Sequence, residues 1–323
     1  MRRLALRSEV RLRILAALTV AAVGCAPPAE APRPRPVLRL STGPQGGGFF
    51  PLGAELVARL SPRMPGVELR SVASAGAVDN VVAIQGAEAD LGFTFADVAY
   101  IGFSGQLKPG QMFDRMRGVA VLQLTPISLV VRPDLHIRTP ADLRGRTVGV
   151  GPPGSGTALT ANLILRKYGL DADSVHLESI GFQEASTRLL RGTLDAMFDN
   201  AINQADSLRR AIEGGARPVA IEGTVVDELR REYPFLKLAS VSAEMYPDLV
   251  TDVHTIGVDG VLICRRDLDQ GIVYDLTRHL FETWRGADGR NALGALDVAE
   301  AAATPIPLHP GAARYYRERE LSH

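Results

Sequence analysis

Residues 147–160 read TVGVGPPGSGTALT: a short apolar run, a glycine-rich turn and the start of a helical pattern. A strand, a tight loop and a helix in this order are typical of α/β proteins, which bind ligands at the carboxyl ends of their strands. Gly151 and Gly156 have the spacing of a P-loop, but Thr157 and Ala158 stand where that motif needs lysine and a hydroxyl residue. The stretch therefore argues against ATP, and it leaves a helix N-terminus that suits a small anion.

The same alternation of strand and helix extends outward from this stretch in both directions. Before it, the pattern predicts strands at 37–41, 67–73 and 89–95 and helices at 49–62 and 77–87. From it onward, the pattern predicts strands at 146–151, 175–180, 194–199 and 217–223 and helices at 155–169, 182–192 and 203–215. Such alternation predicts an α/β fold with mostly parallel sheets that are flanked by helices.

Two kinds of similarity divide the chain into two lobes. AEADLGF (87–93) and GTLDAMF (192–198) each contain a helix end, an aspartate and a buried strand, which indicates a weak internal repeat. PISLVVRPD (126–134) and GVLICRRD (260–267) are apolar strands ending in Arg and Asp, and we interpret them as a hinge of two crossover strands. The folded part also exceeds the usual size of a single core. We therefore expect one lobe at 37–131 and 252–323 and a second lobe at 132–251.

The N-terminal segment indicates export to the cell envelope. Residues 1–24 contain five arginines, one glutamate and an apolar run of eleven residues, which is typical of a signal peptide and too short for a permanent membrane span. AAVGC (21–25) resembles a lipobox, so we expect Cys25 to be lipidated; ordinary cleavage nearby remains the alternative. The proline-rich residues 25–36 would be an extended tether of about 35 Å. We expect a lipid-anchored protein in the periplasm or on the outer face of the cytoplasmic membrane.

Charge and cysteine content exclude several classes of protein. Removing residues 1–24 takes away five of 36 basic and one of 36 acidic residues, which leaves a net charge of about −4. No basic patch stands out, so nucleic acid is not expected as a partner. Cys264 is then the remaining free cysteine, which argues against disulfides and predicts a small buried hydrophobic residue. No later stretch of sequence is apolar enough to cross a membrane.

Each lobe has a strand followed by a glycine-rich loop and a helix start. The first lobe has STGPQGGGFFPLG (41–53), and the second has the loop that contains Gly154 to Thr157. Two facing lobes would direct both helix N-termini, with their free N–H groups and partial positive charge, into one cleft. The cleft would bind a carboxylate. The alternative is that Ser155 and Thr157 only cap a helix and that the glycines only form turns.

Signatures of enzymes and metal sites are missing from the sequence. The six histidines include no H-E-x-x-H motif, so no metal is expected. Pro153 replaces the first glycine of a nucleophile elbow around Ser155. Asp199 with Asn200 is a candidate catalytic carboxylate, but such a pair more often forms a turn or hydrogen-bonds a ligand. We therefore expect neither an enzyme nor a cofactor.

Several segments together resemble the TAXI family (TRAP-associated extracytoplasmic immunogenic proteins), which are solute receptors of TRAP transporters. They are STGPQGGGFFPLG, SAGAVDNVVAIQGAEADLGF, ADVAYIGFSG, VGPPGSGT, VYDLTRHLFE and PLHPGAARYYRE, and they follow the family order over nearly all of 37–323. The resemblance implies a two-lobed periplasmic-binding-protein fold of type 2. It also implies a receptor that captures an organic acid or acidic amino acid and delivers it to a TRAP membrane subunit.

The resemblance also implies a set of ligand-binding residues. Ser155 to Thr157 would hold a carboxylate, Phe49 would form the floor of the pocket, and Gln183 with Asn200 would contact the far end of the solute. Phe49 and Phe50 stand where the family more often has tyrosines. The full set is Ser41, Thr42, Gly47, Gly48, Phe49, Ser74, Thr94, Ser155, Gly156, Thr157, Gln183 and Asn200.

Three alternatives to a TRAP receptor remain open at this point. An ABC-type solute receptor would have ABC membrane genes beside its own gene. A sensor accessory would bind the solute but pass the signal to an adjacent kinase. An envelope enzyme on the same fold would lose turnover on Asp199→Ala.

Overall fold

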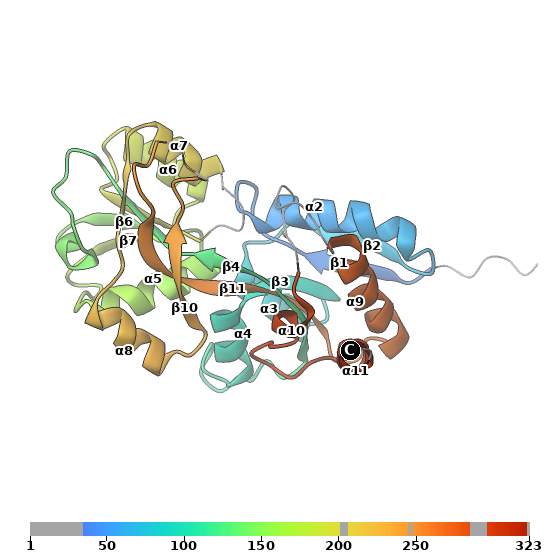
Figure 1. The fold of residues 1–323 in the computed structure, drawn as a ribbon. Helices are drawn as coiled ribbons and strands as arrows, with labels where there is room; N and C mark the ends of the chain where they lie inside the picture. Colours follow the sequence, from blue (N-terminus) through green and yellow to red (C-terminus); the bar gives the residue numbers. More distant parts are fainter. Residues whose placement is uncertain (1–34, 201–205, 245, 247, 285–295, 322–323) are drawn as a thin grey trace, which may run out of the picture. The chain divides into compact units, whose positions relative to one another are not determined.

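The computed structural model describes residues 35–200, 206–244, 246, 248–284 and 296–321, which form two sheets flanked by helices (Figure 1). The strands are β1 (Val37–Ser41), β2 (Glu68–Val72), β3 (Leu91–Phe95), β4 (Met116–Pro126), β5 (Ser128–Val131), β6 (Thr147–Gly149), β7 (His176–Glu178), β8 (Ala196–Asp199), β9 (Arg217–Val219), β10 (Leu236–Val241) and β11 (Val253–Arg265). The α-helices are α2 (Phe49–Leu60), α3 (Ala77–Gln85), α4 (Ala96–Phe103), α5 (Gly156–Lys167), α6 (Phe182–Leu190), α7 (Asp206–Glu213), α8 (Thr224–Glu232), α9 (Gln270–Trp284), α10 (Val298–Ala301) and α11 (Pro310–Glu320). Two 3-10 helices cover Ser61–Arg63 and Pro140–Leu143.

The first sheet has six strands and is mixed. Its order is β10-β11-β3-β1-β2, and β4 pairs with β11. β1 is parallel to β2 and β3, as the alternation of strands and helices predicts. β11 is antiparallel to β3, β4 and β10, because the long strands β4 and β11 carry the chain between the two sheets instead of closing a βαβ unit.

The second sheet has the order β7-β6-β8-β5-β9. β6 is parallel to β7 and β8, whereas β5 is antiparallel to β8 and β9. Successive side chains of β5 alternate between two hydrophobic cores: Leu129 and Val131 lie in the larger one, and Val130 lies in the smaller one. β8 does the same with Phe198 and Met197. Both faces of this sheet are therefore buried, which explains why its strands read as continuous apolar runs.

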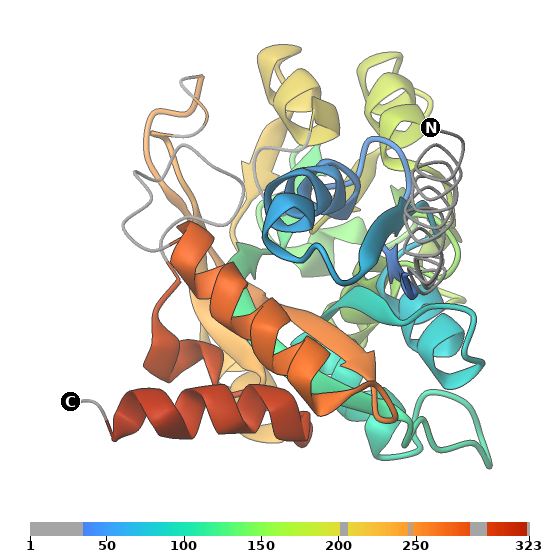
Figure 2. The same ribbon diagram turned by 90° about the vertical axis from the view of Figure 1, so that its right-hand side faces the viewer.

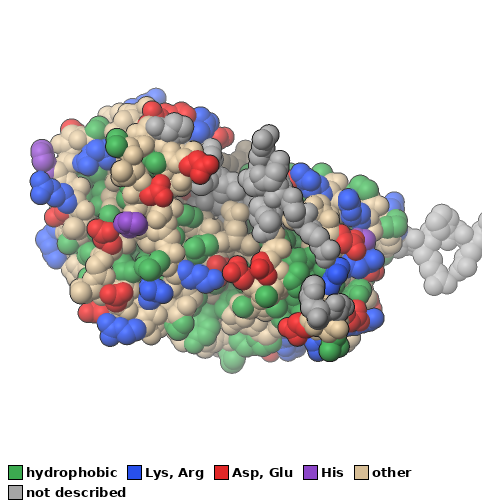
Figure 3. Space-filling view, viewed as in Figure 1, with side chains coloured by type: hydrophobic (Ala, Val, Ile, Leu, Met, Phe, Trp, Pro, Cys, Tyr) green, Lys and Arg blue, Asp and Glu red, His purple; other side chains and the backbone are tan. Residues whose placement is uncertain are grey.

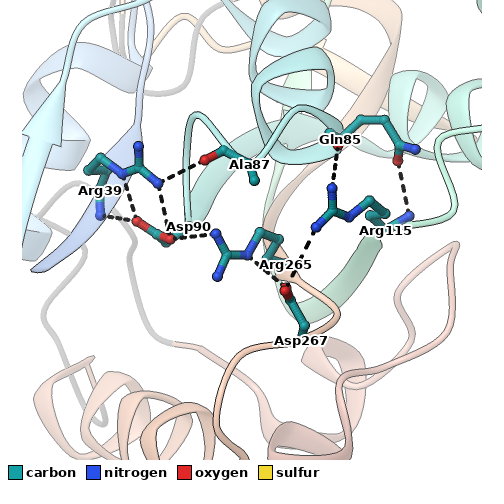
Figure 4. Close-up of polar contacts among 7 residues, drawn as sticks. All are labelled: Arg39, Gln85, Ala87, Asp90, Arg115, Arg265 and Asp267. Atoms are coloured by element: carbon teal, nitrogen blue, oxygen red, sulfur yellow. Dashed lines mark hydrogen bonds and ion pairs between the residues drawn. The ribbon is translucent and has the colours of Figure 1, made fainter. Parts of the chain in front are cut away.

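The internal repeat predicted from the two similar heptapeptides is present in the structure. Asp90, before β3, accepts a hydrogen bond from the backbone N–H of Arg39 at 2.9 Å, and its own N–H donates to the Arg39 carbonyl. Asp195, before β8, has the same two contacts with Thr147. Figure 4 shows that Arg265 and Arg39 both point toward the Asp90 carboxylate. In each sheet, an aspartate thus fixes the start of a central strand to its parallel neighbour.

The chain passes from the first sheet to the second at Ile127. The Ile127 N–H donates to the Ile256 carbonyl at 2.9 Å, and the Thr255 hydroxyl donates to the Ile127 carbonyl at 2.6 Å. The segment of β11 at this crossover is therefore around residue 256, whereas residues 260–264 lie inside the first sheet beside β3. β10, which falls within the range 132–251, also pairs in the first sheet.

The C-terminal helices cover the first sheet. Figure 2 shows α9 and α11 side by side, and α9 also packs against α2. Phe281 of α9 stacks on Tyr315 of α11, with ring centroids 5.4 Å apart. The motif PLHPGAARYYRE begins α11, where the His309 side chain caps the helix by accepting from the Gly311 N–H. These aromatic residues are therefore packing residues of the first lobe.

Cys264 lies in β11 and is fully buried, as the sequence predicts, and burial raises the pKa of its thiol. Within the described ranges, no helix combines the length and apolar character that a membrane crossing requires. On the face shown in Figure 3, basic and acidic side chains are interspersed.

Candidate functional site

A small cavity lies where helix N-termini meet the carboxyl ends of strands from both sheets. Its wall includes the first residues of α2, α3, α5 and α6 and the ends of β3 and β8. The cavity offers about 30 Å³ to the centre of a water molecule. A buried water needs roughly 10–15 Å³ on that measure, so the cavity has room for small molecules of solvent.

Seven of the twelve predicted ligand-binding residues line this cavity. Phe49 packs its ring against Phe93 and Phe95, with centroids 5.3 and 4.8 Å away, so that it forms an apolar part of the wall. The residues of this group are Gly47, Gly48, Phe49, Ser155, Gly156, Thr157 and Asn200.

The N-terminus of α5 presents free N–H groups to the cavity. Ser155 is the N-cap, and its hydroxyl accepts from the Ala158 N–H at 3.3 Å. The N–H groups of Gly156 and Thr157 have no acceptor among the described residues. A Cβ atom at Gly156 would lie 2.6 Å from the Phe95 ring, so glycine is required for the backbone to approach that wall. The sequence reading of this loop as a set of N–H donors is consistent with this geometry.

The N-terminus of α2 faces the same cavity without a side-chain cap. Its N-cap is Gly48, and no side chain accepts from the first helical N–H groups. The loop before it turns at Gly46, whose φ of +88° favours glycine. Two helix N-termini, each with a partial positive charge, therefore contribute to one wall.

The other five predicted residues lie outside the wall. Asn80 is the centre of a buried network: its amide oxygen accepts from Ser41 and Ser74, each at 2.6 Å, and its amide NH₂ donates to the carbonyls of Thr42 and Phe93. Thr42 and Thr94 donate their hydroxyls to the carbonyls of Val72 and Ala77, respectively. Gln183 lies beside Gly46, and its buried Oε1 has no described partner. Ser41, Thr42 and Ser74 thus hold the first loop in place, whereas Thr94 fixes the first residue of α3.

The wall also contains residues that sequence reasoning did not select. Three of them are at or just before the start of α3, where Gly76 has a φ of +131°, and the small residues of SAGAV were a signal of close backbone approach. For Asp199 the sequence leaves three interpretations open: a catalytic carboxylate, a turn residue or a residue that hydrogen-bonds a ligand. This second group consists of Pro44, Ala75, Gly76, Ala77, Phe95, Phe182 and Asp199.

Direct contacts between the two loops close the cavity on one side. The Gly154 carbonyl accepts hydrogen bonds from the N–H groups of Val78 and Asp79, at 3.0 and 3.3 Å. A Cβ atom at Gly76 would lie 3.2 Å from the Ser155 Cα. The N-terminus of α3 is thus occupied by a backbone carbonyl from the other sheet's loop, whereas those of α2 and α5 are available to a solute.

A buried carboxyl group also joins α4 to α5. Asp97 of α4 is fully buried, and the Thr160 hydroxyl of α5 lies 2.6 Å from its Oδ2. Burial raises the pKa of Asp97 to about 6, although the hydrogen bonds from Thr160 and Val98 lower it. Asp97 lies outside the cavity wall, so we interpret this pair as a link between the two sheets.

Asp199 and Asn200 form the polar end of the cavity at the end of β8. Asp199 is 1% exposed, and the Ser207 hydroxyl donates to its Oδ2 at 2.8 Å. Burial raises the pKa of Asp199 to about 7. Asn200 is 6% exposed, and neither its Oδ1 nor its Nδ2 has a described hydrogen-bond partner. An unpartnered buried amide in a cavity wall is a group that a ligand can satisfy.

The wall contains no lysine, arginine or histidine among the described residues. The described part of the chain also contains no group of three His, Cys, Asp or Glu residues placed to hold a metal ion. Binding at this wall therefore depends on backbone N–H groups, the Asn200 amide and the Asp199 carboxyl group.

Comparison with known proteins identifies the class of this protein. The chain belongs to the NMT1-like family, whose model matches residues 40–319. This family corresponds to the TAXI solute-binding proteins, so the resemblance seen in the sequence is confirmed. The protein is accordingly a solute-binding protein and not an enzyme.

Two solved structures show the same fold. MatC from Rhodopseudomonas palustris with bound malate is 18% identical, with a TM-score of 0.58, and the match covers 89% of this chain and 98% of that chain. The alkanesulfonate-binding protein SsuA from Xanthomonas axonopodis pv. citri, bound to MOPS, is also 18% identical, with a TM-score of 0.51 and coverage of 88% and 84%. The predicted type 2 periplasmic-binding-protein fold is thus confirmed.

Proposed function

We propose that this protein captures a small organic anion, a carboxylate or an acidic amino acid, in the cavity between its two sheets. The observation that carries this proposal is the meeting of two kinds of unsatisfied group in one wall. The N–H groups of Gly156 and Thr157 suit a carboxylate, and the Asn200 amide suits a second polar group of the solute, since none of these groups has a partner among the described residues. The malate in MatC is a carboxylate ligand of a protein with the same fold.

The solute would lie with one carboxylate at the N-terminus of α5 and its carbon chain against Phe49. Asn200, with Gln183 nearby, would contact its far end. Ser41, Thr42 and Ser74 would act indirectly, by holding the first loop through Asn80, and Thr94 would act indirectly by fixing the first residue of α3. Entry of such a solute would require the cavity to widen, through opening of the Gly154 contacts and bending of the chain at the crossover near Ile127.

The wider role of the protein is delivery to a TRAP-type membrane subunit. The protein would be anchored through lipidated Cys25, in the periplasm or on the outer face of the cytoplasmic membrane. Uptake of the radiolabelled solute by cells that express the membrane subunit should require this protein, and Cys25→Ala should release it from the membrane fraction. Uptake that does not change when the protein is deleted would contradict this role and favour a sensor accessory.

The test of the binding site is the melting temperature with a panel of anions: malate, succinate, 2-oxoglutarate, aspartate, glutamate and phosphate. A solute at 100 times its dissociation constant stabilises the fold by about 2.7 kcal/mol, which corresponds to several degrees. Asn200→Leu should raise the melting temperature without solute, because it removes an unsatisfied buried amide, and should reduce the shift with solute. Asp297→Ala, which removes a helix N-cap outside the wall, is the control that should leave the shift unchanged. If no anion produces a shift in the unaltered protein, the proposal is wrong.

A further inference from the structure

Asp199 places a carboxyl group in the wall of a cavity that we propose to hold an anion. It lies at the end of β8, almost completely buried, and its described side-chain partner is the Ser207 hydroxyl. Two carboxylates confined in one cavity would repel each other strongly, because burial removes the solvent that screens them. The inference below rests on the proposed function.

No described cation neutralises Asp199. Burial raises the pKa of the Tyr246 phenol, and the nearby Asp199 charge raises it further. On α6 and α7, Glu184, Asp206, Arg209, Arg210 and Glu213 are exposed, and the half-buried Arg188 of α6 is paired with Glu178. The basic residues of α5 lie in its last turn, at the opposite end of the helix from the cavity wall. The first turn of α5 has no acidic residue, and the partner of Asp199 on β5 is the uncharged Ser128. Neutralisation must therefore come from a proton or from the solute.

The hydrogen-bonding requirements favour the proton. An ionised carboxylate only accepts hydrogen bonds, as does the carboxylate of a solute, whereas a protonated carboxyl group donates one. The Ser207 hydroxyl can serve as donor or acceptor, so it accommodates either state of Asp199. Burial already raises the pKa of Asp199 in the direction of the protonated form.

We propose that the solute anion binds together with one proton, which is held on Asp199. The Asp199 carboxylate takes one proton from solvent, which forms an O–H bond and breaks no other bond in the protein or the solute. The neutral carboxyl group then donates its hydrogen bond to an oxygen of the solute. Protonated Asp199 in this way allows the cavity to bind an anion without any basic side chain in the described wall.

Proton-linked binding has a defined pH dependence. Because the pKa of Asp199 in the free protein is about 7, affinity should be nearly constant below pH 7. Above it, affinity should fall about tenfold for each pH unit, since a proton must be supplied with each solute. The decrease between about pH 6 and about pH 8.5 is then about 30-fold.

The experiment is calorimetric titration of the protein with malate, succinate and glutamate at about pH 6 and about pH 8.5. We expect weaker binding at the higher pH. We also expect uptake of about one proton there, which makes the measured heat depend on the ionisation enthalpy of the buffer. Both effects should be lost in Asp199→Asn. Asp195→Asn is the matched control, because Asp195 stands at the opposite end of β8 and keeps its acceptor for the Thr147 N–H; its pH dependence should equal that of the unaltered protein.

Two other results would overturn the proposal. Affinity that is unchanged with pH, or that is stronger for glutamate at the higher pH because ionised Asp199 accepts its ammonium group, would show anion binding without a bound proton. The proposed function would then stand. If none of the three solutes binds at either pH, the proposed function itself fails, and the role of Asp199 as proton carrier fails with it.

Discussion

Asp90 and Asp199 are both buried carboxyl groups beside central strands, yet their surroundings differ completely. Asp90 accepts from the Arg39 guanidinium at 2.9 Å and lies 3.1 Å from that of Arg265 (Figure 4). Asp199 has the Ser207 hydroxyl and no described cation. The first site is at the start of β3, away from the cavity, whereas the second is in the cavity wall.

The difference shows that a carboxylate that serves the fold is balanced by arginines, whereas the carboxylate in the cavity wall is not. A buried carboxylate is costly unless cations and hydrogen bonds compensate it. Around Asp90 the network continues through Arg265 to Asp267 and Arg115, so the charge is compensated within the fold. At Asp199 the Ser207 hydroxyl and the Asn200 backbone N–H donate hydrogen bonds, but no described cation balances the charge, which is left to the proton and the solute.

The largest effect should come from removing the uncompensated charge. Since the pKa of Asp199 is raised from 3.8 to about 7, its contribution to stability is fully present below pH 3.8 and is lost as the pH rises to 7. Asp199→Asn lacks this loss, so its free energy of unfolding relative to the unaltered protein should increase by as much as about 4 kcal/mol between pH 4 and pH 8. Denaturant unfolding at several pH values measures the difference. If the difference in unfolding free energy between Asp199→Asn and the unaltered protein does not change with pH, the Asp199 charge is compensated within the fold, and Asp199 does not differ from Asp90 in this respect.

The second test removes the compensated charge. Asp90→Ala leaves two guanidinium groups and the Arg39 N–H without their acceptor, and should cost about 3 kcal/mol. Asp195→Ala is the natural control, because Asp195 has the same backbone contacts but a more exposed side chain with one guanidinium 3.7 Å away. It should cost about 1 kcal/mol. Equal losses of unfolding free energy would mean that the backbone contacts, and not the arginines, determine the stability of both sites.

The third test concerns Asp97, which lies between these two cases. Thr160→Val removes the hydroxyl donor and should cost about 2 kcal/mol at pH 8, where Asp97 is ionised. At pH 5 the cost should be smaller, since the pKa of Asp97 is about 6 and the protonated group depends less on a donor. Thr277→Val is the control: that hydroxyl donates to the Val273 carbonyl within α9, so its cost should be about 1 kcal/mol and independent of pH. A pH-independent cost for Thr160→Val would show that its bond to the Gly156 carbonyl matters more.

Local patterns in the sequence predicted the elements that surround the site. β1 and β6 were identified as apolar runs followed by glycine-rich loops. The free N–H groups of Gly156 and Thr157 were expected because a helix begins there without acidic residues in its first turn. The fold class was predicted for the same reason, since alternation of strands and helices is a local property.

Non-local pairing could not be predicted in the same way. The apolar run at 260–267 looks like a hinge strand, but only its pairing with β3 reveals that it lies inside the first sheet. The hydroxyls of Ser41 and Ser74 could equally bind a solute, and the choice is made by Asn80, 39 residues away from Ser41 in the chain. Asp199 was ambiguous for a related reason. Its role depends on which cations lie near it in space, and the sequence does not give the distances between its carboxyl group and those cations.

The burial of Cys264 has a practical consequence for following the maturation of this protein. The sequence contains two cysteines, and the thiol of Cys264 is fully buried with its pKa raised, so a maleimide reagent does not reach it in the native state. Native thiol reactivity then reports on residue 25 alone. With Cys25 acylated as proposed, one native thiol per chain would mark precursor that has not been acylated, and a second would become titratable only in denaturant.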